Sequence, residues 1–372
     1  MARRKRIIKR NEAQMILELL EKDQVLAEWD LIIKKIKKIG NDYKIKTQRG
    51  QKLLKVGFEE GRILFMHLAL EHLARNGCYK GIPRLIPTKY GDYYVKTDLG
   101  IYYLTDWIEG KEVKRKDLNQ VTNFVRFLAE IHLAGKNFQS VPYWTIRERW
   151  DDISQQITNK IHKVNNNMGK LPREFQDAWL TYENIAQKAY NLLKSSGYGA
   201  LQETAQRDMT LCHRQFTPRN GFFSKETATI LCWEHCAYGV QLGDLVHYMQ
   251  KVMPSFGWNN NVGEQVIKAY HLVKPLSREE VMTLGAALMF PTAFVKLVDK
   301  FLKGKIEKDN IHIKLEKVKE QEEKKSSFLE DFFARHGLKG FCSGESGHQV
   351  WSEEPFFGFP GNQITSEDDE VD

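Results

Sequence analysis

The 372 residues include 42% hydrophobic and 11% aromatic side chains, which excludes a disordered chain and leaves enough apolar surface for two core-forming lobes. A net charge of +8 over residues of both signs permits nucleic-acid binding but does not indicate it. The five cysteines have scattered spacings typical of reduced thiols rather than a disulfide framework, and Cys232 and Cys236 do not make a zinc site by themselves.

Residues 1–30 alternate basic and apolar positions and suggest a helix that leads into the body, with residues 1–24 as a basic N-terminal extension. Basic residues cluster there and again between Lys34 and Lys46; a solvated face is the simpler interpretation and an anion-attracting face the alternative. No apolar run approaches about 18 residues, and no apolar stretch with a cleavage site follows the basic start. We therefore expect no membrane insertion and a cytoplasmic protein.

Residues 25–110 have the pattern of a small antiparallel sheet with one helix. The runs 43–47 and 51–56 predict a hairpin that turns at Arg49-Gly50. The stretch 59–77 predicts an amphipathic helix that Gly77 ends, and two β-rich runs follow at 92–97 and 100–108. The expected order is two or three strands, a helix and two more strands.

Residues 111–303 are mainly helical in pattern, with helices expected at 118–136, 146–165, 172–195, 262–275 and 277–303. Residues 211–252 form an island of turns and short β-like pieces between them. A β-rich first third followed by a helical remainder predicts an α+β, two-lobed fold. Residues 304–372 are Lys/Glu-rich and then Gly/Ser/Pro-containing, which predicts a charged, disordered tail. A docking peptide is the alternative for its aromatic cluster Trp351, Phe356, Phe357 and Phe359.

Several motifs occur in an order that matches a known group: KLLKV (52–56), LEHLARNG (70–77), IPRLIPTKYGDYYVK (82–96), YYLTDWIEGKE (102–112), LCHRQFTPRN (211–220), ILCWE (230–234) and GDLVHYMQK (243–251). Through them, the chain from about 25 to 303 resembles the aminoglycoside and choline kinase group of kinase-like proteins, and most closely the CotS-type spore coat proteins of endospore-forming bacteria. The resemblance implies a protein-kinase-like fold with an N-lobe (25–110) and a helical C-lobe (111–303).

Phosphoryl transfer in this fold needs a lysine on the phosphates, metal-binding groups and a carboxylate that takes the proton of the acceptor hydroxyl. The resemblance makes Lys55 the phosphate-holding lysine and Glu71, on the following helix, its ion-pair partner. The alternative is an exposed strand lysine and a helix-surface glutamate. The linker between the lobes, Leu104 to Gly110 with Asp106, is expected to meet the adenine ring if nucleotide binds.

The two aspartate positions of the family pattern hold other residues. The catalytic loop has His213-Arg214-Gln215 where the family has His-Gly-Asp, and glutamine cannot accept a proton as a general base does. The metal-binding aspartate is replaced by Cys232, and magnesium prefers hard oxygen ligands to a protonated thiol. Asn220 keeps a metal-binding position. Glu234 is expected on the same side of the strand as Cys232, so a shifted carboxylate is the alternative to a site without catalytic metal.

Three further positions are expected to be structural. Asp244 matches the residue that braces the catalytic loop, with capping of the following helix as a second role. His132 lies in a helix among apolar residues and predicts a packing histidine. His213 is expected to fix its loop by hydrogen bonding rather than to act as a base.

The two substitutions predict a non-catalytic kinase-like protein that uses no cofactor. The resemblance implies a structural or assembly component of the spore coat, made in the mother-cell cytoplasm and deposited on the coat, with other coat proteins as partners. One alternative is an active kinase for a small hydroxylated or amino substrate, which uses ATP and magnesium with Glu234, Asp208 or Glu203 as substitute acids. Another is a basic nucleic-acid-binding protein.

Overall fold

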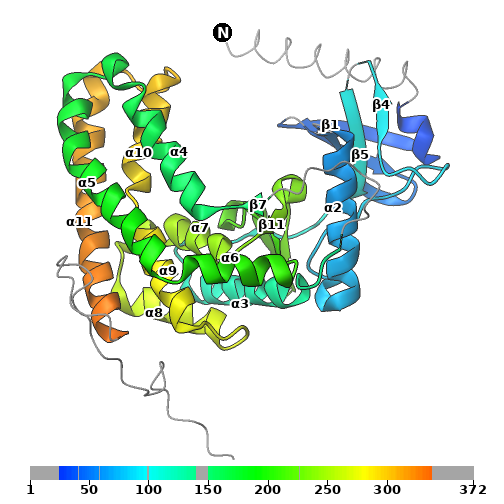
Figure 1. Ribbon diagram of the computed structural model, residues 1–372. Coiled ribbons are helices and arrows are strands. Elements are labelled where there is room, and N and C mark those ends of the chain that lie inside the picture. Colours follow the sequence, from blue (N-terminus) through cyan, green and yellow to red (C-terminus); the bar gives the residue numbers. More distant parts are fainter. Residues whose placement is uncertain are drawn as a thin grey trace, which may run out of the picture.

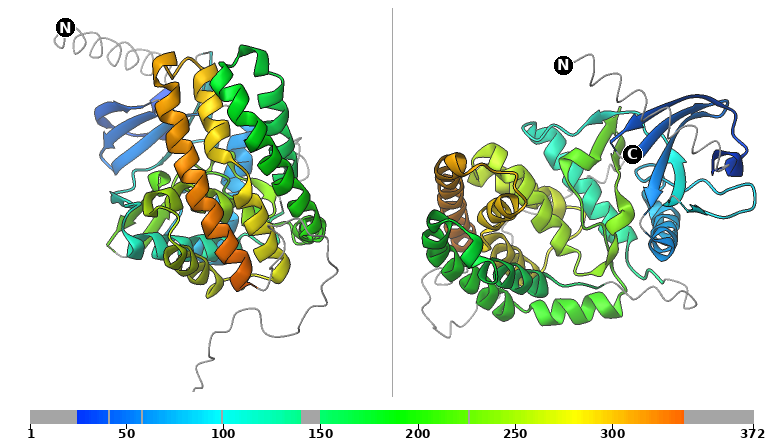
Figure 2. Two further views of the ribbon diagram at one scale, coloured as in Figure 1. Left: turned by 90° about the vertical axis from the view of Figure 1, so that its left-hand side faces the viewer. Right: turned by 90° about the horizontal axis from the view of Figure 1, so that it is seen from above.

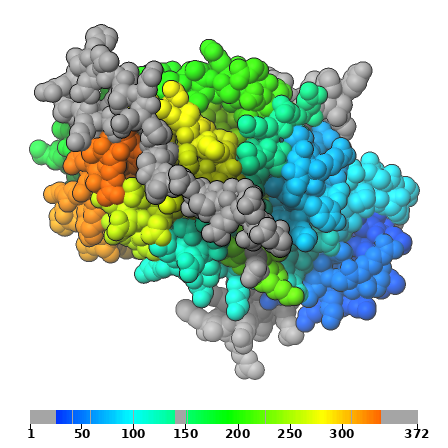
Figure 3. All heavy atoms as spheres, turned by 90° about the horizontal axis from the view of Figure 1, so that it is seen from below, coloured from blue at the N-terminus to red at the C-terminus, as the bar shows by residue number. Residues whose placement is uncertain are grey.

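The computed structural model describes residues 25–40, 42–57, 59–98, 100–139, 150–225 and 227–336. They form two lobes that lie side by side: an N-terminal lobe built on a sheet, drawn in blue and cyan, and a larger helical lobe (Figure 1). Seen from below, the blue lobe lies at one end of the molecule and the orange C-terminal helix at the other (Figure 3). The predicted α+β, two-lobed fold is confirmed.

The N-terminal sheet has five antiparallel strands in the order β1-β2-β3-β5-β4. The predicted hairpin is present, because β2 and β3 pair from Thr47 with Gly50 to Tyr43 with Leu54. Gly50 has a φ of +88°, which glycine adopts without steric strain and which allows the tight turn. The strands are β1 (Ile33–Ile39), β2 (Asp42–Thr47), β3 (Gly50–Gly57), β4 (Val95–Thr97) and β5 (Gly100–Asp106).

This lobe has a small core of its own. A 3₁₀ turn, Val25–Trp29, packs its buried side chains against buried residues of β2, β3 and β5. The indole nitrogen of Trp29 donates to the Ile86 carbonyl at 2.9 Å and ties the turn to the chain before β4. On the outer strand β1, the side chains of Lys34, Lys35, Lys37 and Lys38 are exposed, as a solvated face requires.

The predicted helix between the strands is α2 (Glu60–Leu73), and it continues into a wider turn, Ala74–Cys78, where Gly77 has a φ of +107°. Its buried face joins the lobes. Phe65 makes edge-to-face contacts with Phe138 and Tyr238 of the helical lobe at ring-centroid distances of 5.3 and 5.5 Å. Such aromatic pairs stabilise an interface beyond their buried area.

The helical lobe contains α3 (Leu118–Ala134), α4 (Ile153–Asn165), α5 (Arg173–Ser195), α6 (Tyr198–Arg207), α7 (Leu242–Val252), α8 (Asn260–His271), α9 (Arg278–Met289), α10 (Thr292–Leu302) and α11 (Ile311–Arg335). The single helix predicted at 277–303 is two helices, because Pro291 cannot continue the hydrogen-bond ladder of α9. The helix α6 was not predicted, and α7 was expected only as the helix that follows Asp244. Residues 146–149 of the predicted helix 146–165 lie outside the described residues, and α4 begins after Asp152, whose side chain caps it.

Short strands position the loops between the lobes. One three-stranded sheet has the order β10-β9-β6, with β6 (Lys111–Glu112), β9 (Gly221–Ser224) and β10 (Thr227–Ile230). The other has the order β7-β11-β8, with β7 (Trp150–Asp151), β8 (Leu211–Cys212) and β11 (Ala237–Gly239). The segment between β8 and β9 and the segment between β10 and β11 therefore both run between the two sheets, because β8 pairs with β11 and β9 pairs with β10.

The prediction of a disordered tail from residue 304 is wrong up to residue 336. Residues Ile311–Arg335 form α11, which lies along α10, α9 and α5 (Figure 2). Its apolar side chains recur at helical spacing among the lysines and glutamates, and Phe328, Leu329, Phe332 and Phe333 are buried in the main core. Burial of this apolar stripe stabilises a helix that composition alone would place in solvent.

The helices under α11 leave room for its aromatic rings at two glycines. A Cβ atom on Gly285 of α9 would lie 2.5 Å from the Phe333 ring, and one on Gly263 of α8 would lie 2.3 Å from the Phe328 ring. The close approach of α11 to the core therefore depends on glycine at both positions. The aromatic cluster between residues 351 and 359 lies outside the described residues.

Among the described residues, no single helix is long and apolar enough to cross a membrane. The bent pair of α9 and α10, which meet at 41°, passes the test of length and apolar composition only when joined, and most of its apolar side chains lie in the core. The four cysteines in this part of the chain, Cys78, Cys212, Cys232 and Cys236, are free thiols.

Candidate functional site

The catalytic-loop segment, from His213 to Asn220, lies between β8 and β9, and the turn that carries Cys232 and Glu234 follows β10. The two segments are joined directly, because the Leu231 amide donates to the Asn220 carbonyl at 2.9 Å. The structure thus brings together the catalytic loop and the metal-binding segment that the sequence indicated.

His213 fixes the loop, as predicted. Its ring is fully buried, its Nδ1 accepts from the Gln215 amide at 3.1 Å, and its Nε2 contacts the Leu231 carbonyl at 2.9 Å. Since a carbonyl only accepts, Nε2 carries the proton. Burial lowers the pKa of His213 to about 4, so the ring is neutral at physiological pH. Both ring nitrogens are used, which leaves no atom for general-base work.

Asp244, in the first turn of α7, braces the catalytic loop. Its carboxylate accepts from the backbone amides of His213 and Arg214, each at 2.6 Å, and from Nε2 of His132 at 3.4 Å. Burial by itself raises the pKa of Asp244, but the hydrogen bonds from His132 and from the loop amides hold that pKa below its usual value. The side chain is not the cap of α7, whose N-cap residue is Gln241.

His132 is the structural histidine that the sequence predicted. It is fully buried in α3, and its Nδ1 accepts from the Tyr270 hydroxyl of α8 at 2.6 Å while Nε2 donates to Asp244. Burial lowers the pKa of His132. Three helices and the catalytic loop are therefore held by one buried polar chain, Tyr270–His132–Asp244, in which every member has a partner.

At the two aspartate positions the structure places uncharged groups. Gln215 is half-buried. Its backbone carbonyl accepts a hydrogen bond from Nδ2 of Asn220 at 3.0 Å, so Asn220 is oriented by its own loop. Cys232 is half-buried, and burial raises the pKa of its thiol, which therefore stays protonated at neutral pH. No cluster of three or more histidine, cysteine, aspartate or glutamate side chains within the described residues could hold a metal ion.

The predicted geometry of Glu234 needs correction. β10 ends at Ile230, Cys232 has a left-handed backbone with φ +67°, and Trp233–His235 form a 3₁₀ turn, so Cys232 and Glu234 do not share a strand face. The turn instead directs the Glu234 carboxylate at Lys55, with which it forms an ion pair across the lobes. The side chains of Lys55 and Glu234 are only 14% and 12% exposed.

Two further residues complete a cluster around Lys55. The Tyr103 hydroxyl donates to the same Glu234 carboxylate at 2.6 Å. The Asp42 carboxylate accepts from the Val56 amide and lies close enough to Lys55 and Glu234 for their charges to shift its pKa, which burial raises. Burial lowers the pKa of Lys55, but the charge and hydrogen bond of Glu234 together with the charge of Asp42 and the nearby Cys232 hold the pKa above its usual value. The cluster thus holds one cation between two carboxylates.

The sequence did not indicate Tyr103 or Asp42. Both follow from strand register: Tyr103 on β5 is directly opposite Lys55 on β3, and Asp42 begins β2, whose next residue is opposite Leu54. The sequence does not say which residues face each other until the strand order is known.

The predicted ion pair between Lys55 and Glu71 is wrong. Both oxygens of the Glu71 carboxylate are bound by the Arg84 guanidinium, whose Nε donates at 2.7 Å. This two-bond arrangement suits the planar guanidinium better than a lysine ammonium. Glu71 therefore ties α2 to the chain that follows it, and Lys55 takes its partner from the other lobe.

Asp106, at the end of β5, forms an exposed ion pair with Lys52. It lines a pocket of about 290 Å³ at the linker between the lobes, together with Leu53, Trp107–Gly110, Phe222 and Leu231. The pocket thus lies at the linker, between Leu53 of the N-lobe sheet and Phe222 and Leu231 of the C-lobe. Binding of an adenine ring there stays a prediction. Most of this lining is apolar, as ring-binding sites usually are.

Of the proposed substitute acids, Glu203 lies on α6 and Asp208 comes directly after it. Asp208 accepts from Arg207 Nε at 3.1 Å, and Glu203 is exposed. Within the described part of the chain, neither acid has a hydrogen bond or ion pair with Lys55 or the catalytic loop. Of the three candidates, only Glu234 reaches Lys55.

Comparison with known proteins identifies the family. Residues 22–332 match the family described as "Spore coat putative kinase YutH". The chain belongs to this family. It is 25% identical over 342 residues to spore coat protein S of Bacillus subtilis (strain 168), a match that covers 87% of this chain and 95% of that protein. The matched range includes most of α11, in agreement with the packing of that helix on the core.

Solved structures show the same fold. An aminoglycoside phosphotransferase from Alicyclobacillus acidocaldarius aligns with a TM-score of 0.71 at 18% identity, over 84% of this chain and 95% of that one. A microcompartment-associated aminopropanol kinase aligns with a TM-score of 0.55 at 14% identity, over 84% and 98%. This member of the spore coat family therefore has the protein-kinase-like phosphotransferase fold, as the resemblance implied.

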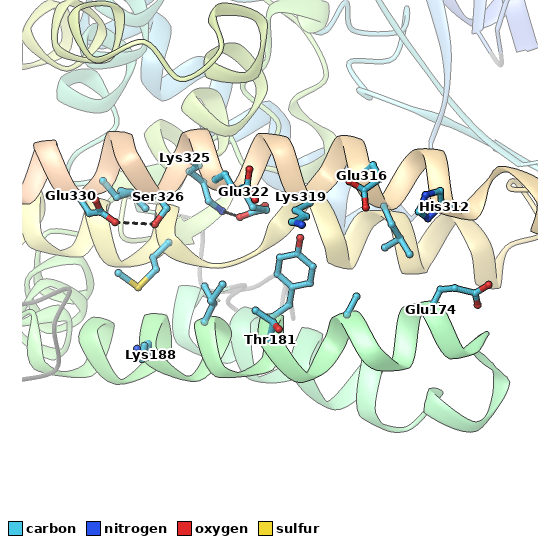
Figure 4. A pocket seen from close by; sticks show the side chains of 17 residues that line it. Glu174, Thr181, Lys188, His312, Glu316, Lys319, Glu322, Lys325, Ser326 and Glu330 are labelled. Atoms are coloured by element: carbon cyan, nitrogen blue, oxygen red, sulfur yellow. Dashed lines mark hydrogen bonds and ion pairs between the residues drawn. The ribbon is translucent and has the colours of Figure 1, made fainter.

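The protein has a larger pocket away from the predicted site residues. A pocket of about 620 Å³ lies between α5 and α11, with Glu174, Thr181 and Lys188 on one side and His312, Glu316, Lys319 and Glu322 on the other (Figure 4). At its wall the buried ammonium of Lys325 pairs with Glu322 and donates to the Phe290 carbonyl at 3.0 Å. None of the predicted site residues lines this pocket.

Proposed function

We propose that this protein is a catalytically inactive, kinase-like component of the spore coat, made in the mother-cell cytoplasm and deposited on the coat together with other coat proteins. Family membership and the likeness to spore coat protein S support the coat role. The observation that carries the loss of catalysis is the cluster in which Lys55 is paired with Glu234 beside Asp42.

The residues at the site do not fit a magnesium-bound triphosphate. A phosphate-holding lysine must offer its charge to the nucleotide, but Lys55 already neutralises Glu234, and Asp42 adds a second negative charge. Gln215 cannot take the proton of an acceptor hydroxyl, and the thiol of Cys232 is a poor ligand for magnesium. Loss of any one of these groups costs a kinase several powers of ten in rate.

The polar chain around Asp244 supports a scaffold role for the same fold. Tyr270, His132 and Asp244 hold three helices and the catalytic loop through buried hydrogen bonds that need no substrate. Buried, fully partnered networks of this kind stabilise one arrangement of the chain. A protein that keeps them is rigid enough to present fixed surfaces to other coat proteins.

The direct test measures phosphate release and nucleotide binding by the purified full-length chain. We expect no magnesium-dependent turnover of ATP and no rise in melting temperature that requires both ATP and magnesium. Adenosine, which lacks phosphates, should bind the linker pocket at least as well as ATP. Turnover that Glu234→Ala abolishes would overturn the proposal.

The coat role is tested in cells of an endospore-forming bacterium that carries this chain as a fluorescent fusion. The fusion should collect around the developing spore, and an Asn220→Ala variant should collect there equally well, because the deposit does not depend on catalysis. A fusion that stays dispersed through the mother cell would contradict the coat role without bearing on the catalytic site.

An active phosphotransferase is the second candidate, because Glu234 is directed into the site and the linker pocket is retained. In that function Glu234 would hold the metal of a magnesium-bound nucleotide instead of pairing with Lys55. The two functions predict opposite results for one variant. Removing the Glu234 charge abolishes ATP binding if this carboxylate holds the metal, and strengthens it if the carboxylate only blocks Lys55.

A further inference from the structure

The two outer strands of the N-terminal sheet carry lysines directly opposite one another. In the pairing of β1 with β2, Lys35 lies opposite Lys46, and Lys37 lies opposite Lys44. Side chains at such positions have Cβ atoms only ~5 Å apart, so like charges there destabilise the sheet. Lys44 is half-buried and the other three lysines are exposed. These four residues are called the lysine patch below.

The lysine patch lies on the same face of the sheet as Lys55. Side chains alternate along a strand, and Lys44 is opposite Leu53 of β3, two positions before Lys55. The ammonium of Lys44 lies 3.7 Å from the centre of the Trp107 ring in the linker, and Leu53 lines the linker pocket. The patch therefore extends from the linker to β1, which is the outermost strand of the sheet.

The positive charge of the patch is not compensated by the part of the chain that the structure describes. Among those residues, no carboxylate forms an ion pair with any of the four lysines. The acids of the neighbouring linker have other partners, since Asp106 pairs with Lys52 and Glu109 accepts from the Gln51 side chain at 3.4 Å. An anionic partner on the patch would relieve the repulsion within both lysine pairs.

The same chain carries an acidic segment that matches the patch in charge. Five of the six residues 367–372 are acidic: Glu367, Asp368, Asp369, Glu370 and Asp372. In an extended chain, alternate side chains recur every ~7 Å, which is also the spacing between the two lysine pairs along β1 and β2. Carboxylates two positions apart in such a segment can therefore each meet one pair of lysines.

We propose that the lysine patch binds the acidic segment 367–372 of a second copy of this chain, and that repeated contacts of this kind join copies head to tail. The N-lobe lies at one end of the molecule and α11, after which the segment follows, lies at the other (Figure 3). A contact between two different surfaces adds copies in a row unless the rotation between copies closes a ring. The contact requires neither nucleotide nor another coat protein, so its failure would leave the proposed function untouched.

The test is sedimentation velocity of the full-length chain at increasing protein concentration. We expect the average sedimentation coefficient to rise with concentration at 0.01 M salt and to stay at the monomer value at 1 M, because the Debye length falls from about 30 Å to about 3 Å. Lys35→Glu/Lys37→Glu should weaken association at least about tenfold. The control Lys303→Glu/Lys305→Glu makes the same change of net charge at two exposed lysines after α10 and should leave association unchanged.

A charge exchange identifies the partner surface. Asp368→Lys/Glu370→Lys should abolish association on its own, but an equal mixture of this variant with Lys35→Glu/Lys37→Glu should associate, because each patch then meets a segment of opposite charge. A mixture that stays monomeric would overturn the proposal, as would a segment that binds the patch of its own copy and gives no dependence on concentration. Association that nuclease treatment removes would mean that nucleic acid bridges the copies, and it would also overturn the proposal.

Discussion

The ion pair between Lys55 and Glu234 gives the sharpest prediction, because one substitution distinguishes the proposed inactive protein from an active phosphotransferase. The variant is Glu234→Gln, which keeps the shape of the side chain and removes its charge. Both partners are almost completely buried, at 14% and 12% exposure. Breaking a buried pair by removing one partner costs about 3–5 kcal/mol of unfolding free energy, because the other charge is left without compensation.

Asp42 reduces the expected cost. Its carboxylate remains near Lys55 in the variant, and its repulsion by Glu234 is relieved. We therefore expect Glu234→Gln to lower the free energy of unfolding by about 2–3 kcal/mol, below the full cost of an orphaned charge. The double variant Lys55→Met/Glu234→Gln should recover part of this loss, because no unpaired cation remains. Urea unfolding of the wild type, both single variants and the double variant measures the interaction.

The same variant should bind ATP more tightly. At neutral pH the cluster of Lys55, Glu234 and Asp42 has a net charge of about −1, and the substitution brings it to about zero. One unit charge at ~4 Å is worth about 1–4 kcal/mol, so we expect at least about a fivefold gain in ATP affinity. Adenosine affinity should stay the same and serves as the control for the linker pocket. Weaker ATP binding by Glu234→Gln than by the wild type would refute the reasoning.

Three further outcomes follow from the packing and the buried histidines. Phe333→Ala should lower the free energy of unfolding, measured by urea denaturation, by about 3–5 kcal/mol. Ile313→Ala, on the exposed face of α11, should change it by less than about 0.5 kcal/mol. Equal effects would mean that α11 is not part of the core. Gly285→Ala should cost about 1–3 kcal/mol in the same assay, because the new methyl group would overlap the Phe333 ring, and an unchanged midpoint would contradict that contact. Burial lowers the pKa of His213 from 6.5 to about 4, so the folded state binds a proton at this ring less readily than the unfolded state does. The stability that the neutral ring contributes is therefore complete above about pH 6.5 and is lost as the pH falls to about 4. The free energy of unfolding of His213→Asn should therefore change less steeply with pH in that interval, by a slope that corresponds to up to about one bound proton. Identical slopes for the wild type and the variant would contradict a neutral buried ring.

Much of the fold was predictable from periodicity, and its failures have physical causes. The hairpin β2–β3 and the helix α3 show clear periods of 2 or 3.6 and were predicted nearly to the residue, whereas α2, predicted to be amphipathic, buries the consecutive residues Ile63–His67 and has no single apolar face. The helix α11 was missed because its lysines and glutamates outnumber its apolar residues, although Ile311, Leu315, Val318 and the four core residues after them follow helical spacing. A periodicity count would have found α11, whereas composition pointed to solvent.

The site was predictable as a set of positions but not as a set of contacts. The family resemblance located Gln215, Cys232 and Glu234 in the right segments, because the motifs 211–220 and 230–234 match the family pattern. The resemblance assigned the wrong partner to Lys55, because a spacing of sixteen residues fixes the order of a strand and a helix but not the direction in which the helix turns its glutamate. Arg84, which lies thirteen residues after Glu71, takes that carboxylate, and only the fold reveals their proximity.

The two kinds of polar residue at this site differ in what they need. The carboxylate of Asp244 is bound by backbone amides and a histidine of the same chain, so its charge is compensated whether or not a ligand is present. An aspartate at position 232 would have no such compensation from backbone amides, and the charges of Glu234 and Asp42, which already act on this position, would oppose its ionisation. If nucleotide is not bound, as we propose, the Lys55–Glu234 pair joins the lobes in place of a substrate. A single chain can therefore lose the charges of catalysis and keep the fold, because the residues that brace the fold and the residues that perform the chemistry are different.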